Sequence, residues 1–417
     1  MTELKECTGD RIVQSQPGLE NNYLDIGAWQ SNIHKLYLVR FFMGCHLISG
    51  VLIPFFLTWG KLTFIEVMFL QSYFTIMILI FEIPCGAIAD YISRKLSLIL
   101  GGLSTALAAL VYASYPNIVI FAIGETLFAL GNAFTSGTDQ AFSYDTLRKM
   151  GKEEEISKVM ARNRSYFLIG VGISAPIGSI IGVVLSLSLT MSFMFFPFIL
   201  ATFISLTLKE PNHDLEKDET ENYFKIVRSG FKELTRNSVL RIIAIDLIMI
   251  DSVVFFIFWM YQLYLEQLGF QLALFGLVAA VMTIVEIIFT NLVSKLEKRY
   301  KNKKVFLQFY TMIPGIGFIL MATIYFVPVS IALILIVIGF GISRDLLLIK
   351  GINKQIETNN RATVLSTINM IGSLLRTVLY PVIGFLVMWN LSATFILLGS
   401  IMIIVALLSR IKDEYLK

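Results

Sequence analysis

Residues 66–95 read EVMFLQSYFTIMILIFEIPCGAIADYISRK, an apolar stretch that ends in a short basic segment. A helix needs roughly 20 apolar residues to cross the hydrocarbon core of a bilayer, and residues 66–89 reach that length. The rest of the chain repeats this pattern, so we predict an all-α polytopic membrane protein with twelve transmembrane helices. Their predicted bounds are 35–59, 66–89, 95–115, 117–138, 164–186, 190–208, 238–263, 272–293, 305–326, 328–348, 362–388 and 391–409.

The composition of the chain agrees with this prediction. Of 417 residues, 56% are hydrophobic and 15% are charged, and the mean hydropathy is +0.74. Soluble domains carry about 25% charged residues, so a single soluble core, a disordered chain and a collagen-like chain are excluded. Cys7, Cys45 and Cys85 are too few for a disulfide framework.

The sequence contains no cluster of metal ligands, no nucleophile elbow and no phosphate-binding loop. We therefore expect neither an enzyme nor a metal or organic cofactor, and no direct use of ATP. If the chain carries out an energy-requiring process, we expect the proton motive force to drive it. The expected partners are a small-molecule substrate, protons and the lipid bilayer, with no nucleic acid, and the expected state is a monomer.

Lysine and arginine are unevenly distributed between the connections. They gather in the N-terminal tail and after the fourth, sixth and eighth predicted helices, whereas the opposite connections contain only Lys61. Basic connections stay on the cytoplasmic side of a membrane, so we predict that both termini are cytoplasmic. The first 33 residues are polar and lack the apolar core of a signal peptide. We expect a multi-pass protein of the bacterial inner (cytoplasmic) membrane.

A polar segment near the middle divides the chain into two halves. Phe224, Val227, Phe231 and Leu234 recur there at helical spacing, which indicates an amphipathic helix on the cytoplasmic face; a solvated linker fits the segment equally well. The predicted organisation is a mostly flexible cytoplasmic tail, a six-helix bundle, a central cytoplasmic loop, a second six-helix bundle and a C-terminal tail. These parts cover residues 1–33, 34–209, 210–236, 237–410 and 411–417.

The two halves also resemble each other locally. Glu82 and Glu286 both precede a basic connection, and the segment SGTD at residues 136–139 has a counterpart in SRD at residues 343–345. Two six-helix halves with weak internal similarity are typical of transporters. We therefore predict two pseudo-symmetric bundles.

Ionisable residues inside the predicted helices are candidate site residues, because such groups are costly in hydrocarbon and usually face protein or a water-filled cavity. At about 1.5 Å of rise per residue, Glu125, His46, Asp251 and Arg376 fall near the bilayer midplane, where transporter sites lie. The candidates are Arg40, His46, Glu82, Glu125, Asp246, Asp251, Glu286 and Arg376.

Glu125 is the expected main proton carrier, because no basic residue lies near it in the sequence. Glu82 and Asp251 are expected to assist, although Glu82 could instead brace the end of its helix. The remaining candidates are expected to bind substrate or to act as charge partners: His46, Arg376, Asp246, Glu286 and Trp259.

These assignments have structural alternatives. Asp246 or Asp251 could pair with Arg376 or Arg40 to hold helices together. His46 could be a hydrogen-bonded core histidine, and Trp259 could belong to the interfacial aromatic belt.

Residues 86–95, GAIADYISRK, resemble the signature of the loop between helices 2 and 3 of the major facilitator superfamily, Gly-x-x-x-Asp-Arg-x-Gly-Arg-Arg/Lys. Gly86, Asp90, Arg94 and Lys95 match this pattern. The resemblance covers residues 35 to 410 and implies a twelve-helix facilitator that works by alternating access. It also implies that these four residues belong to a cytoplasmic gate.

Three further segments resemble drug exporters of the same superfamily. The run Glu82-x-Pro84-x5-Asp90-x3-Arg94-Lys95 is similar to a variant signature in a tetracycline efflux branch of Gram-positive bacteria. Residues 136–145 resemble a segment of related facilitators and add Asp139 and Asp145 to the implied gate. Residues 170–182 resemble the antiporter motif of drug/proton exchangers through Gly172, Pro176 and Gly178, although generic helix packing explains these small residues as well.

Together these observations favour a proton-driven exporter of hydrophobic or amphipathic compounds, including drugs such as tetracycline. The alternative is a proton symporter that imports a small metabolite or an organic anion, which Arg376, Arg40 and His46 could bind. A non-transporting receptor or scaffold is a third possibility. The buried charges argue against it, because a scaffold gains little from maintaining them.

Overall fold

The computed structural model describes residues 17–211, 223–356 and 361–416, and every regular element within these ranges is helical. Eleven helices are long and apolar enough to span a membrane, or twelve when a bent pair is counted as one more span. This confirms the predicted fold class. The spanning helices after the first are α3 (Phe64–Tyr91), α4 (Arg94–Ser114), α5 (Ile118–Thr135), α7 (Ile156–Val184), α8 (Leu187–Phe193) with α9 (Phe195–Leu206), α11 (Ser238–Phe255) with α12 (Ile257–Gln267), α13 (Phe275–Arg299), α14 (Lys303–Met321), α15 (Val327–Ser343), α17 (Arg361–Trp389) and α18 (Leu391–Leu408).

The first span is broken, whereas we expected one helix over residues 35–59. It consists of α1 (Pro17–Gly44), η1 (Leu47–Gly50), α2 (Leu52–Pro54) and η2 (Phe55–Trp59), and its two parts are bent by 65°. At the break the backbone leaves the helical pattern, because the amide of His46 donates to the carbonyl of Gly44 at 2.7 Å.

The break has a tertiary cause. A Cβ at Gly44 would overlap the carbonyl oxygen of Phe167, so the backbone of the first span lies directly against α7. Residues 17–33 correct a second expectation, because they are helical in α1 rather than flexible. Residues 1–16 of the expected tail lie outside the described residues.

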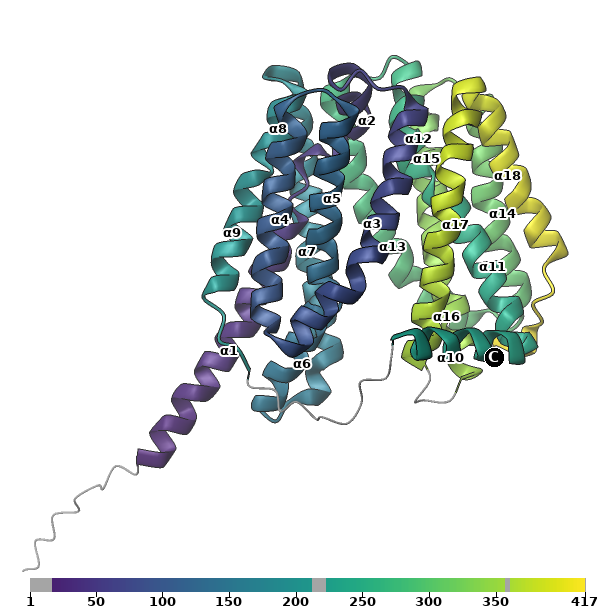
Figure 1. Cartoon of the computed structure of the whole chain (residues 1–417). Helices are drawn as coiled ribbons and strands as arrows, with labels where there is room; N and C mark the ends of the chain where they lie inside the picture. The colour runs from purple at the N-terminus through teal and green to yellow at the C-terminus, as the bar shows by residue number, and fades with distance from the viewer. Residues whose placement is uncertain (1–16, 212–222, 357–360, 417) are drawn as a thin grey trace, which may run out of the picture.

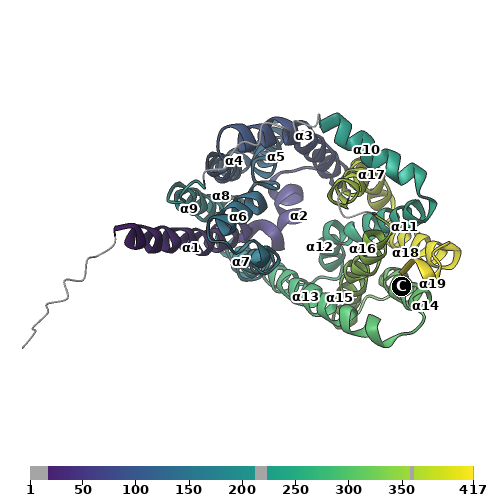
Figure 2. The ribbon, with the colours of Figure 1, turned by 90° about the horizontal axis from the view of Figure 1, so that it is seen from below.

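The helices form two bundles, one from α1 to α9 and one from α11 to α18 (Figure 1). Within the bundles α4 packs against α5 and α9, and α14 packs against α15 and α18. A continuous hydrophobic core joins the bundles, since it includes Phe55, Met68 and Phe121 from the first and Phe256 and Tyr380 from the second. Seen from below, the helices of the two bundles surround a common centre (Figure 2).

The two halves meet most closely where α3 packs against α17 and α7 packs against α13. Small residues allow this approach: a Cβ at Gly384 would lie 3.0 Å from the Cα of Ile65, and a Cβ at Gly276 would overlap the carbonyl of Ala175. The hydroxyl of Ser72 adds a hydrogen bond of 2.7 Å to the carbonyl of Thr377.

Short helices lie mainly at one end of the bundles. They are α6 (Thr138–Lys149), α10 (Tyr223–Arg236), α16 (Asp345–Lys354) and α19 (Asp413–Leu416). Helix α10 corresponds to the expected amphipathic helix and lies across the lower end of the second bundle, and the halves diverge toward this α10 end (Figure 1). Leu234 is buried, and Gly230 lies against Thr367 of α17. Residues 212–222 of the central loop and the side chains of Phe224 and Val227 lie outside the described part of the chain.

Candidate functional site

Glu125 lies inside the first bundle, on α5, with 4% of its surface exposed. The side-chain amide of Gln71 on α3 donates to Glu125 Oε1 at 2.7 Å, and the hydroxyl of Tyr112 on α4 also lies against this carboxyl. Gly124 makes room for the tyrosine, because a Cβ there would overlap its ring. Three helices therefore position one carboxyl away from lipid.

Sequence reasoning missed both neighbours of Glu125. Gln71 is buried and Tyr112 is 2% exposed. Gln71 could have been noticed in the sequence, because it places a side-chain amide in the apolar run of residues 66–89. A buried polar group needs a hydrogen-bonding partner.

A second cluster lies inside the other bundle. Arg376 Nη1 on α17 lies 2.5 Å from Asp251 Oδ2 on α11, and the Asp345 carboxyl at the start of α16 faces Asp251. The Arg376 guanidinium also lies 5.3 Å from the centre of the Phe255 ring. A cavity of about 140 Å³ is lined by Asp251, Asp345 and Arg376.

The Asp251–Arg376 pair is one of the pairings that the sequence left open, whereas Asp345 as a third member was missed. Its Oδ1 atom is buried and has no hydrogen-bond partner among the described residues. Two facing carboxyls repel each other when both are ionised, and one shared proton removes that repulsion. The cluster can therefore hold a proton as well as a salt bridge.

Tyr380 lies between the two clusters. It follows Arg376 by about one helical turn on α17, is 4% exposed, and lies within electrostatic range of both Arg376 and Glu125. Its ring centre is 5.4 Å from that of Phe256 and 6.0 Å from that of Trp259. Trp259, a predicted substrate contact, thus lies at the boundary between the halves beside Tyr380. We call Gln71, Tyr112, Glu125, Asp251, Asp345, Arg376 and Tyr380 the central cluster.

Asp246 lies outside the central cluster. It pairs with Arg344, which is 1% exposed and whose Nε donates to the hydroxyl of Thr311 at 2.7 Å. The hydroxyl of Ser409 donates to the other Asp246 oxygen at 3.0 Å. Neither Arg40 nor Arg376 is the partner of Asp246. Arg40 lies 3.5 Å from Asp139, and Arg376 is paired with Asp251. Arg344, the partner that was missed, lies in the SRD segment at residues 343–345.

Three more predicted residues are placed apart from the central cluster. His46 lies at the break of the first span, with its ring 5.3 Å from that of Phe198. Glu82 follows Gln71 on α3 by about 16 Å along the helix axis. Glu286 on α13 pairs with Arg164 on α7 at 3.3 Å, and this ion pair joins the two halves.

The predicted gate residues connect elements of the first bundle. Arg94 forms an ion pair with Asp145 on α6, donates to the carbonyl of Ala141 at 3.2 Å and lies 3.9 Å from Asp90. The backbone amide of Lys95 donates to Glu210 at 2.9 Å. Sequence reasoning missed Glu210, which follows α9 and accepts hydrogen bonds at the start of α4.

The glycines of the gate and of the antiporter-like segment differ in their surroundings. A Cβ at Gly178 would overlap the carbonyl oxygen of Leu47, so this glycine brings α7 against the first span. A Cβ at Gly172 or at Gly86 would meet open space. Pro176 lies inside α7. Close packing therefore accounts for one glycine of the α7 segment but not for the other.

Comparison with known proteins agrees with this architecture. The model of the Major Facilitator Superfamily matches residues 38–378. Similar solved structures include the nucleoside transporter NupG (16% identity, TM-score 0.74, covering 90% of this chain and 97% of that chain) and a D-xylose-proton symporter (11% identity, TM-score 0.69, covering 92% and 98%). A search of curated proteins found no match. On the family match and the fold together, this chain belongs to the major facilitator superfamily and is a secondary transporter, not an enzyme.

Proposed function

We propose that this transporter is a proton-coupled efflux antiporter for hydrophobic or amphipathic cations, including drugs. The observation that carries this proposal is the charge of the central cluster. Glu125, Asp251 and Asp345 supply three carboxyls, whereas the two guanidiniums near them are already paired, Arg376 with Asp251 and Arg344 with Asp246. Such a site favours protons and organic cations over anions.

Glu125 is the proposed proton carrier. Its burial disfavours a bare charge, while the Gln71 amide can donate to the carboxylate once the proton has left. A lipophilic cation that arrives near the carboxylate stabilises the ionised form and so competes with the proton. This competition couples the two fluxes in opposite directions.

The proposed conformation is open to the cytoplasm. By the positive-inside rule, the basic residues favour a cytoplasmic location for the α10 end, and the halves diverge toward this end (Figure 1). Asp251 keeps 38% of its side chain exposed, and the 140 Å³ cavity beside it is lined by α11, α16 and α17. Rocking of the halves about the central cluster would then expose it to the other side.

Proton symport of a small metabolite or an organic anion is the second candidate. Arg376 lines the cavity and is 21% exposed. If Asp251 takes up the proton, Arg376 is released from its ion pair and can bind a carboxylate. In this case the substrate and the proton move in the same direction.

Inverted membrane vesicles with an acidic interior distinguish these two functions. A pH dye follows the internal proton concentration while tetraphenylphosphonium, tetracycline and small organic acids are added in turn. Efflux antiport predicts that a lipophilic cation releases internal protons. Vesicles with Glu125→Gln should lose this response, and vesicles with the exposed replacement Glu414→Gln should retain it. Failure of every drug, together with proton uptake driven by a metabolite in right-side-out vesicles, would support symport instead.

A further inference from the structure

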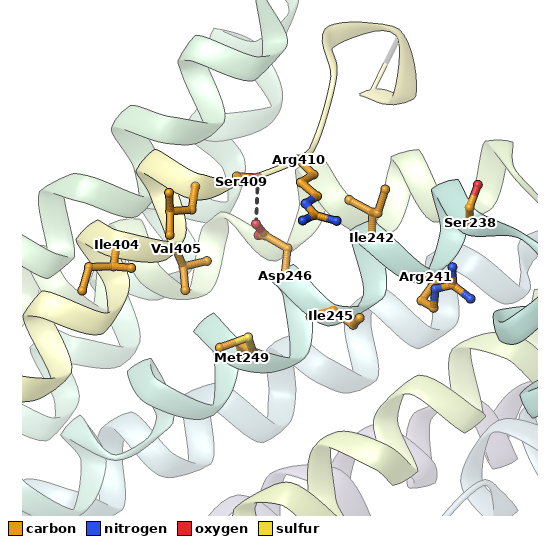
Figure 3. A pocket seen from close by; sticks show the side chains of 11 residues that line it. Ser238, Arg241, Ile242, Ile245, Asp246, Met249, Ile404, Val405, Ser409 and Arg410 are labelled. Carbon is orange, nitrogen blue, oxygen red and sulfur yellow. Dashed lines mark hydrogen bonds between the residues drawn. The ribbon is translucent and has the colours of Figure 1, made fainter.

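A pocket of about 650 Å³ lies between α11 and α18, near the α10 end of the second bundle (Figure 3). The figure shows side chains of α11 on one wall and side chains of α18 and of the stretch after it on the other. This pocket is separate from the cavity beside Arg376 and takes no part in the function proposed above.

One part of the pocket is apolar and open to the outside of the bundle. Ile245 on α11 and Ile404 on α18 line it with exposed fractions of 51% and 52%, and Leu408 is 73% exposed. In a membrane protein an outward apolar surface of this kind faces acyl chains rather than water. The groove between the two helices therefore suits a hydrocarbon chain.

The other part of the pocket carries positive charge. Arg241 lies in the first turn of α11 and donates through Nη1 to the carbonyl of Thr235 on α10 at 3.1 Å. Arg410 follows the end of α18 and also lines the pocket. The acidic residue of the wall, Asp246, is held by Arg344 and Ser409, so its charge is compensated and the two arginines make the mouth of the pocket positive.

We propose that this pocket binds an anionic phospholipid. Arg241 and Arg410 hold the phosphate of the headgroup by charge-assisted hydrogen bonds, and one acyl chain lies in the groove formed by Ile245, Ile404 and Leu408. A soluble anion would gain nothing from the apolar groove, and a lipid without net charge would gain little from two arginines. The combination of both features selects a lipid with a net negative headgroup.

The bound lipid would connect α11 to α18 beside the contact between Asp246 and Ser409. A ligand that binds only the folded protein raises its melting temperature by mass action. The proposal therefore predicts binding and stabilisation by phosphatidylglycerol, whatever the direction of transport.

The test uses the purified full-length chain in an uncharged detergent. Native mass spectrometry and thermal unfolding are recorded with phosphatidylglycerol, with phosphatidylcholine and with inorganic phosphate alone. We expect one retained phosphatidylglycerol per chain and a higher melting temperature with that lipid. The variant Arg241→Gln/Arg410→Gln should bind it at least about tenfold more weakly. Ile404→Trp should weaken binding by filling the groove while keeping both charges.

A matched control removes two exposed basic residues of the first bundle at the same end, Arg148→Gln/Lys149→Gln, and should bind as the wild type does. Equal binding of phosphatidylcholine and phosphatidylglycerol by the wild type would overturn the proposal. This comparison uses the wild-type protein alone, so it does not depend on whether a variant folds. Stabilisation by inorganic phosphate alone would assign the arginines to a soluble anion and would also overturn it. If the control variant lost as much phosphatidylglycerol binding as the Arg241→Gln/Arg410→Gln variant, the binding would reflect nonspecific charge attraction, and the proposal would be wrong.

Discussion

The guanidinium of Arg376 lies 2.5 Å from the carboxylate of Asp251, and one helical turn later Tyr380 on the same helix lies within electrostatic range of Glu125 of the other half. A single helix, α17, therefore pairs with a charged group of its own bundle and lies within electrostatic range of a charged group of the other. Movement of one half relative to the other would change the distance between Tyr380 and Glu125. In the proposed mechanism, this arrangement would link the protonation of Glu125 to the position of α17.

The ion pair of Asp251 and Arg376 can be tested by a double-mutant cycle. Arg376→Gln leaves two facing carboxyls without their positive partner, and should lower the melting temperature. Asp251→Asn in the same chain removes one of these carboxyls and should recover much of the loss. We expect a coupling energy of roughly 0.5–3 kcal/mol, measured by thermal unfolding in detergent. Strictly additive effects would show that the two side chains act independently.

The buried pair of Asp246 and Arg344 should matter more for stability than for transport. Replacing Arg344 by Gln leaves a buried carboxylate without its partner, which costs about 3–5 kcal/mol. Reduced yield and a lower melting temperature are the expected results. The exposed Lys158, 4.0 Å from Glu155, provides the comparison, and Lys158→Gln should leave both measurements unchanged. A stable, fully folded Arg344→Gln protein would contradict the structural assignment.

Substitutions at two glycines of α7 can distinguish an effect on helix packing from a functional role of the antiporter-like segment. Gly178→Ala should reduce folded yield, because its Cβ would overlap the carbonyl of Leu47. Gly172→Ala should be tolerated, because its Cβ meets open space on the same helix. The measurement is the fraction of monodisperse protein after purification, followed by transport in vesicles. A folded Gly172→Ala protein without transport would instead indicate a functional role for this position.

The hydrogen bond from Gln71 should set the pH range of coupling. The Gln71 amide stabilises the ionised Glu125 carboxylate, since it donates to Oε1 at 2.7 Å. In Gln71→Leu the carboxyl therefore releases its proton less readily, and half-maximal exchange should move to a more alkaline pH. The pH profile of drug-driven proton release in vesicles measures this shift. An acid shift, or an unchanged profile, would show that Gln71 does not act through Glu125.

Much of the fold could be predicted from the sequence, because a long apolar run is a local property. Residues 66–89 lie within α3, and residues 391–409 correspond to α18 to within one residue. The break in the first span could not be predicted in this way. It depends on contacts of Gly44 with Phe167 and of Gly178 with Leu47, which are far apart in the sequence.

The candidate site could be predicted only in part. Depth along a helix placed Glu125, His46, Asp251 and Arg376 at a similar level, but depth does not tell which way a side chain points. The structure brings Asp251 to Arg376 and leaves His46 among aromatic rings. Gln71 and Asp345 were missed as partners of Glu125 and Asp251, because the direction in which their side chains point depends on how the helices pack.

In the proposed mechanism, an organic cation and a proton compete for Glu125. The most direct measurement is proton release on substrate binding, made with purified protein in weakly buffered detergent solution. A pH dye records the protons released as tetraphenylphosphonium is added, and equilibrium dialysis records the bound cation. Competition for Glu125 predicts proton release with the wild type and with Glu414→Gln, and cation binding without proton release, or no binding, with Glu125→Gln. Undiminished proton release from the Glu125→Gln protein would contradict it.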